Sequence, residues 1–493
     1  MKKQFLLGLF YMLGLNLLIK PFYIFGIDRL LQLEVNKTSG EGTYGLYTVF
    51  FTWSYLYYIV LDLGFADYNK RQTAKDSSYA PHHFASFLIS KLFLGVIYFI
   101  ILALSIWIAG YETEVFTLVI PLGFIQLFIS FIFFFRSVIA GLLLFKLDSF
   151  FQVMDKLLMI LFGGILLFTN LFGQVTIYHF VYAQLLAYGL TAICSGVVAL
   201  RHTKNLGTIS WQYNPKQIIE IAREALPLAV LVLIMTVYNR LDTIMIERLL
   251  PDGKLEVDVY ARAYRLLDSV QAFTYIFGAL LLPLYAKQIH EKESVSPLVE
   301  LGLRSVLSIA IPLVIGTFFY RSELMEMLYY LPPNSYDSQV LAALIATFIP
   351  IGMVYILGSL ITANNNLVLL NAISFVGVIA NFILNYYLIH SHKALGATYA
   401  TLITQGLVAL TYLIACYRIF NLEIGKTFYL PLFYFIVGVF TIFWLTYHFG
   451  QANLMGYVVG GALCIPYAVL VKFFLKSDIH ILASSRKEQI ETE

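Results

Sequence analysis

Long apolar stretches follow one another along the whole 493-residue sequence, and the segments between them are short and polar. About 20 apolar residues cross the hydrocarbon core of a bilayer as a helix, because backbone amides there must pair within their own segment. Hydrophobic residues make up 60% of the chain and charged residues 12%, with a mean hydropathy of +0.79. Soluble domains have roughly 45–50% apolar and about 25% charged residues. The sequence therefore predicts an all-α, polytopic integral membrane protein.

The apolar stretches predict about 14 transmembrane helices, at roughly 20 residues each. Their even number places both ends of the chain on the same side of the membrane. The expected spans are 5–32, 44–65, 84–110, 115–135, 151–170, 176–200, 224–249, 259–286, 305–320, 338–361, 366–390, 395–416, 428–448 and 453–471.

Basic residues lie mainly on one side of this arrangement. With the N-terminus inside, the outer loops contain only Lys37, Lys254, Arg321 and Lys393, whereas most of the 32 Lys and Arg residues fall in inner segments. Cytoplasmic loops of membrane proteins carry the excess of Lys and Arg. We therefore expect both termini to be cytoplasmic.

An internal repeat relates the sixth and twelfth spans. Residues 182–193 (YAQLLAYGLTAI) share six of twelve identities with residues 399–410 (YATLITQGLVAL). Chance similarity in Leu-rich sequence is the alternative to a duplicated six-helix unit, whose two copies would insert in parallel. A duplication predicts two pseudo-symmetric six-helix lobes plus a C-terminal helix pair. The expected parts are an N-terminal lobe (1–203), a cytoplasmic linker (204–223), a C-terminal lobe (224–418), a helix pair (419–476) and a cytoplasmic tail (477–493).

Motifs of catalysis and metal binding are absent from the sequence. It contains no P-loop, GxSxG, HExxH or GxGxxG pattern, and its three cysteines form neither a CxxC pair nor a disulfide framework. We therefore expect no enzymatic activity, no catalytic residues, no cofactor and no bound metal, and nothing indicates a nucleic-acid partner.

Charges inside apolar helices are the strongest candidates for function, because each costs about 2.5 to 3.5 kcal/mol at a helix centre on insertion scales. Lipid cannot solvate them, so they must face protein or water. Guanidinium groups bind phosphate through bidentate, charge-assisted hydrogen bonds. The candidates for substrate binding in a water-filled cavity are Lys20, Arg240, Asp242, Arg262, Arg265 and Asp268.

A structural explanation of the same charges stays open. Arg262, near a helix end, would then extend its charge to the outer interface, while Arg265 and Asp268 neutralise each other, as do Arg240 and Asp242. The Asp155–Lys156 pair, near the inner end of its span, is expected at the interface. Asn381 and Asn385 share one face of a span, where they could contact a hydroxyl-rich ligand or hydrogen-bond a neighbouring helix.

Loose helical patterns occur along nearly the whole chain. They are 44–47 (YGLY), 63–65 (LGF), 241–247 (LDTIMIE), 259–266 (VYARAYRL), 281–287 (LLPLYAK), 381–389 (NFILNYYLI) and 395–401 (LGATYAT). In these patterns and their order, the chain resembles the polysaccharide-exporter branch of the multidrug/oligosaccharidyl-lipid/polysaccharide (MOP) transporter superfamily, the Wzx-like oligosaccharide flippases.

The resemblance implies a flippase that carries a polyprenyl-pyrophosphate-linked oligosaccharide, a repeat unit of O-antigen or capsule, across the cytoplasmic membrane by alternating access. It implies two lobes around a central cavity with a cationic lumen, and often a proton or sodium gradient as the energy source. The implied partners are the lipid-linked glycan, the bilayer, and a polysaccharide polymerase with its chain-length machinery.

Two other functions remain open. A multidrug or metabolite cation antiporter of the same superfamily would be expected to have a carboxylate-rich cavity, whereas basic residues prevail in this chain. A membrane-embedded glycosyltransferase would need a large catalytic outer loop, and the longest outer loop, at about 321–337, is too short.

Overall fold

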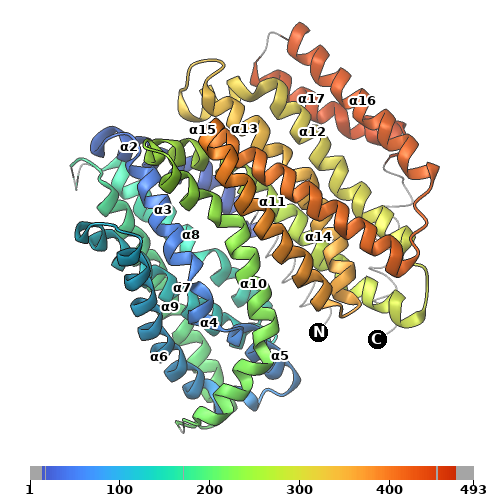
Figure 1. Ribbon diagram of the computed structural model, residues 1–493. Coiled ribbons are helices and arrows are strands. Elements are labelled where there is room, and N and C mark those ends of the chain that lie inside the picture. The colour runs from blue at the N-terminus through green and yellow to red at the C-terminus, as the bar shows by residue number, and fades with distance from the viewer. Residues whose placement is uncertain are drawn as a thin grey trace. The chain divides into compact units, whose positions relative to one another are not determined.

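The computed structural model describes residues 14–16, 18–169, 171, 173–211, 213–450 and 453–473. Within these residues every regular element is a helix (Figure 1), which confirms the predicted all-α membrane fold. The chain divides into two compact units, Met1–Ile244 and Met245–Glu493. This division falls inside one helix, and the limits of the predicted six-helix lobes stay a prediction.

In the first unit, α7 packs along α9 and forms the centre of the unit. The core between helices is rich in aromatic rings, such as the cluster of Tyr44, Tyr47 and Phe180. The helices of this unit are η1 (Phe22–Asp28), α2 (Arg29–Ser39), α3 (Thr43–Leu56), α4 (Tyr58–Asp62), α5 (Phe65–Lys75), α6 (Tyr79–Ile108), η2 (Thr113–Val115), α7 (Phe116–Gly141), α8 (Phe145–Phe168), α9 (Ile177–Leu206) and most of α10 (Pro215–Leu249).

Two irregularities in the first unit have local causes. Pro21 has no N–H to donate, and the helix continues beyond it as the π-helical turn η1. Leu63 and Gly64 adopt left-handed φ values of 49° and 79°, which ends α4 and starts α5. Between α3 and the α4–α5 segment the chain bends by 41°.

In the second unit, α11 packs against α13 and α14, and the C-terminal pair α16 and α17 packs on α12 (Figure 1). The helices are α11 (Gly253–Glu291), α12 (Ser296–Tyr329), α13 (Tyr336–Ala346), α14 (Phe348–Ala363), α15 (Leu367–Phe420), α16 (Lys426–Phe449) and α17 (Leu454–Leu470). The longest, α15, has 54 residues and breaks at Lys393, where φ is 56° and ψ is −134°.

The helices follow the 14 predicted spans closely, but fewer of them are both long enough and apolar enough to cross a membrane. In the described part of the chain, eight helices are long and apolar enough to cross a membrane, or nine when the bent α3 to α5 segment counts as one. The 54-residue α15 is one of these and covers two predicted spans, while the charged α10 and α11 are not among them. Residues 5–13 of the first span and the predicted tail lie outside the described residues.

Candidate functional site

Arg240 and Asp242 lie on α10 within the first unit. The guanidinium carbon of half-buried Arg240 is 5.6 Å from the centroid of the Tyr55 ring on α3. Asp242 is buried, with 2% of its surface exposed. The face of a tyrosine ring attracts a guanidinium through the ring quadrupole. The contact therefore joins a cation of α10 to an aromatic ring of α3.

The three charges predicted on the eighth span have different surroundings in α11. Half-buried Arg262 forms ion pairs with Asp258 at 3.2 Å and, across to α13, with Asp337 at 3.3 Å. These contacts join α11 to α13, and a role of Arg262 as a ligand group or as an interfacial cation stays a prediction. Asp268 is exposed.

Arg265 lies one helical turn beyond Arg262 and shares an aromatic neighbour with it. Its Nη1 donates to the Tyr329 hydroxyl at 3.4 Å, and the Arg262 guanidinium is 6.0 Å from the same ring. The phenol thus fixes the direction of the Arg265 side chain. In each unit, then, a half-buried arginine of a predicted span is held against a tyrosine.

Lys20 and the two asparagines also fall in defined surroundings. Half-buried Lys20 directly precedes Pro21 and η1. Asn381 and Asn385 are fully buried: Asn385 Nδ2 donates to Asn381 Oδ1 at 2.9 Å, and Asn381 Nδ2 donates to Thr404 Oγ1 at 3.3 Å. Thr404 lies beyond the α15 break, so these bonds join the two arms of α15 and favour a helix-joining role.

Sequence reasoning missed Lys91, a fully buried lysine in α6. Its ammonium donates to Asp62 Oδ1 at 2.8 Å, to Ser130 Oγ at 2.7 Å and to the Leu61 carbonyl at 3.1 Å. It therefore satisfies a carbonyl at the C-terminal end of α4, beside the Leu63–Gly64 break. The signal was a charge inside the apolar span 84–110, the criterion that had found the other candidates.

Lys156 of α8 contacts residues of η1 and α9 in the first unit, and its expected place at the membrane interface stays a prediction. Its ammonium pairs with Asp155 at 3.1 Å and donates to the Tyr188 hydroxyl at 2.7 Å. It also lies 5.2 Å from the Tyr23 ring centroid and 5.1 Å from that of Tyr188. Because the protein's own ammonium fills this aromatic pair, an organic cation cannot occupy the same place.

A further charge cluster holds the α15 break. Lys393 pairs with Asp252 and, at 3.2 Å, with Glu256. Glu256 also accepts the Ala394 N–H at 3.2 Å. The hydrogen bond from Lys393 lowers the pKa of the Asp252 carboxyl below its usual range. The cluster joins the start of α11 to the break in α15.

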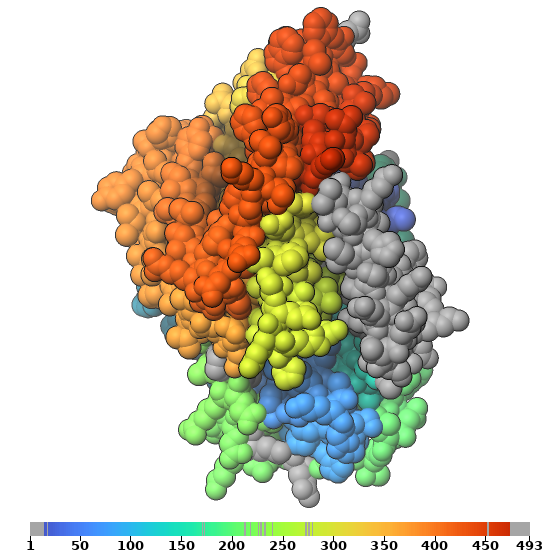
Figure 2. Space-filling view, turned by 90° about the vertical axis from the view of Figure 1, so that its right-hand side faces the viewer, coloured from blue at the N-terminus to red at the C-terminus, as the bar shows by residue number. Residues whose placement is uncertain are grey.

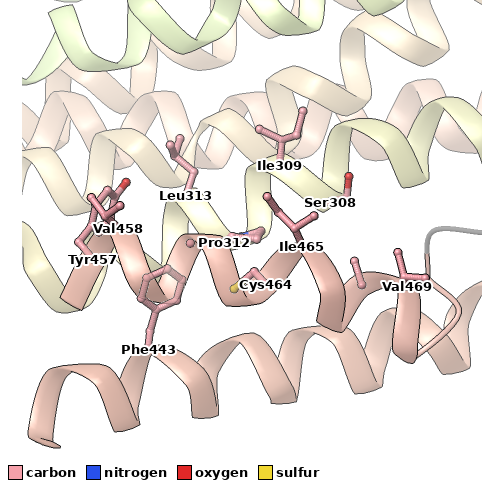
Figure 3. A pocket seen from close by; sticks show the side chains of 12 residues that line it. Ser308, Ile309, Pro312, Leu313, Phe443, Tyr457, Val458, Cys464, Ile465 and Val469 are labelled. Atoms are coloured by element: carbon pink, nitrogen blue, oxygen red, sulfur yellow. The ribbon is translucent and has the colours of Figure 1, made fainter. Parts of the chain in front are cut away.

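An apolar groove of about 540 Å³ lies between α12, α16 and α17 in the second unit. Figure 3 shows Ile309 and Leu313 of α12 facing Ile465 and Val458 of α17, with Phe443 of α16 at the side. Figure 2 shows the yellow α12 surface beside the red helix pair. With almost wholly apolar walls, the groove suits a hydrocarbon chain.

No group of three His, Cys, Asp or Glu side chains is placed to hold a metal ion in the part of the chain that the structure describes. Its charged groups are instead arranged as ion pairs and cation–aromatic contacts.

Comparisons with known proteins agree with this description. The family model "Polysaccharide biosynthesis protein" matches residues 39–287, and no curated protein sequence matches the chain. The fold is similar to "Lipid II flippase MurJ, inward closed conformation", with a TM-score of 0.69 and 13% identity, over 93% of this chain and 99% of that one.

Multidrug transporters share the fold as well. An inward-facing multidrug resistance MATE family transporter of the MOP superfamily has a TM-score of 0.63 and 15% identity, over 80% of this chain and 94% of that one. The bent form of the Vibrio cholerae MATE transporter VcmN has a TM-score of 0.54 and 14% identity, over 85% and 97%. The chain therefore belongs to the polysaccharide biosynthesis protein family, and its fold is that of these multi-pass membrane transporters.

Proposed function

We propose that this transporter is a flippase for a polyprenyl-pyrophosphate-linked oligosaccharide in the cytoplasmic membrane, with both termini cytoplasmic. The observation that carries the proposal is an arginine in contact with a tyrosine in each unit. Arg240 lies over the Tyr55 ring, and Arg265 donates a hydrogen bond to the Tyr329 hydroxyl. Guanidinium groups bind diphosphate bidentately, and tyrosine rings and hydroxyls suit sugars. The family match to polysaccharide biosynthesis proteins supports the same substrate class.

Two further observations support a lipid-linked anion over an organic cation. The groove between α12, α16 and α17 has the walls that a polyprenyl chain requires. The aromatic pair around Lys156 is filled by an ammonium, which disfavours a second cation by like-charge repulsion. We propose that the groove receives the lipid chain and that Arg240 and Arg265 are each recognition residues for the diphosphate.

The test is complementation of a strain that lacks this protein, with surface polysaccharide and lipid-linked precursor measured at matched membrane levels. We expect Arg240→Ala and Arg265→Ala to accumulate precursor, because a hydrogen bond to a charged group contributes about 1.5–3 kcal/mol, or ~10- to 150-fold in binding. Arg265→Lys should restore only part of the transport, since an ammonium cannot bind bidentately.

Arg248→Ala is the matched control. Arg248 lies on α10 with Arg240, but it is exposed and pairs with the adjacent Glu247 at 3.2 Å. We expect its activity to equal that of the wild type. If the deletion leaves surface glycan and precursor unchanged while tolerance to cationic drugs falls, the proposal is wrong and the antiporter alternative replaces it.

A further inference from the structure

A second groove, of about 670 Å³, opens on the first unit between α6, α7, α9 and the segment after α9. Its walls are apolar and its rim is polar. The walls include Phe84, Leu88, Phe135, Val197 and Leu200, and the rim carries Lys204, Thr208 and Trp211. No part of the proposed transport function uses this groove.

The walls are formed by tight packing between helices. The Phe135 ring lies directly on Gly196 of α9, where a Cβ atom would come within 2.9 Å of the ring. Phe84 of α6 stacks on Phe135 with ring centroids 6.1 Å apart. Val197, the next residue of α9, is 42% exposed and lines the open side. The groove is therefore a fixed feature of the helix surface.

The rim is fixed as well and carries positive charge. Lys204 is exposed in the last turn of α9, and Arg201, three residues earlier, is exposed on the same side of the helix. The segment after α9 is held by a hydrogen bond from the Ser210 N–H to the Pro81 carbonyl at 3.0 Å. This bond holds the neighbouring Trp211, 67% exposed, at the rim.

The position of this rim matches a boundary between membrane and water. The apolar helix α9 ends at Leu206, directly before the rim segment. Tryptophan prefers the headgroup level of a bilayer, and lysines and arginines at helix ends attract anionic headgroups. A ligand here would have its polar end at Lys204 and its apolar end along Val197 and Phe135.

We propose that this groove binds an anionic phospholipid, with its phosphate against Lys204 and Arg201 and part of one acyl chain along the apolar walls. Free phosphate would make no use of the walls. The net-neutral headgroup of a zwitterionic lipid would gain less from the two cations. The volume accommodates part of a single chain, so the rest of the lipid remains in the bilayer.

The test uses the purified full-length protein in detergent with equal amounts of phosphatidylglycerol and phosphatidylethanolamine, and native mass spectrometry counts the bound lipids. We expect the wild type to retain phosphatidylglycerol several-fold over phosphatidylethanolamine. Lys204→Gln should lose this preference. Val197→Trp should lose retention of both lipids, because the indole fills the groove.

Two control variants test whether a loss of lipid binding is specific to the groove. Lys75→Gln removes an exposed lysine at the end of α5, and Ile193→Trp adds an indole one turn before Val197, at a residue 63% exposed that does not line the groove. Both should bind lipid like the wild type. Equal retention of the two lipids by the wild type, equal losses in the controls, or displacement of the lipid by inorganic phosphate would each overturn the proposal.

Discussion

At the scale of single residues, removal of the buried charge of Lys91 should destabilise the fold. The Lys91 side chain is 1% exposed and that of its partner Asp62 13%. Lys91→Met leaves the Asp62 carboxylate without its cation and removes one of two donors to the Leu61 carbonyl, the other being Ser130 Oγ at 2.9 Å. Breaking a buried pair in this way costs about 3–5 kcal/mol. We therefore expect a thermal midpoint several degrees lower, measured in detergent by fluorescence-detected size exclusion.

The double variant Lys91→Met with Asp62→Asn is the matched comparison. It removes both charges, and we expect it to recover part of the lost stability because no uncompensated carboxylate remains. Lys75→Met, at an exposed position, should leave the midpoint unchanged. If the Lys91→Met protein is as stable as the wild type, the buried pair of Lys91 and Asp62 does not stabilise the break at Leu63 and Gly64.

Charges inside spans could be found from the sequence, but their partners could not. Arg262 was predicted from its position in an apolar helix, whereas its pair with Asp337 depends on the packing of α11 against α13, 75 residues away in the sequence. Asn381 and Asn385 were placed on one face by their spacing, and the bond to Thr404 required the fold of α15. The spacing of residues predicts which of them share a helix face, whereas the packing of helices decides which residues that face contacts.

At the scale of helices, the contact between α12, α16 and α17 depends on glycine. The Phe443 ring of α16, 1% exposed, meets Gly316 of α12 and Gly460 of α17, and a Cβ at either glycine would come within 2.7 Å of it. The next residue, Gly461, lines the apolar groove and has no atom within 4 Å of its would-be Cβ. The two adjacent glycines therefore differ only in what they face.

Gly460→Ala and Gly461→Ala should consequently have opposite effects on stability. Overpacking costs about 1–3 kcal/mol, while alanine in a helix interior gains up to about 1 kcal/mol over glycine. We expect a lower thermal midpoint for Gly460→Ala and an equal or higher one for Gly461→Ala, both in detergent. Equal midpoints for the two variants would mean that the Phe443 ring moves aside without cost.

At the scale of the whole molecule, the apolar pattern predicted the fold because the bilayer permits few alternatives to helices. Helix positions followed directly from runs of hydrophobic residues. The break at Lys393 falls in the predicted loop between the spans 366–390 and 395–416. The break at Leu63 lies inside the predicted span 44–65, and only Gly64 hints at it. Local apolar runs therefore defined the spans, whereas tertiary contacts such as those of Lys91 and Lys393 accompany the bends.

The orientation of the chain is a property of the whole molecule and is tested by labelling. The excess of basic residues in inner segments predicts that the loop around residue 333 faces outward and the end of α5 inward. A membrane-impermeant maleimide should label Pro333→Cys in intact cells and Lys75→Cys only after permeabilisation, since both positions are exposed. The unaltered chain gives the background, because Cys416 and Cys464 are buried and Cys194 is half-buried. Labelling of Lys75→Cys in intact cells, with Pro333→Cys protected, would reverse the orientation and place both termini outside.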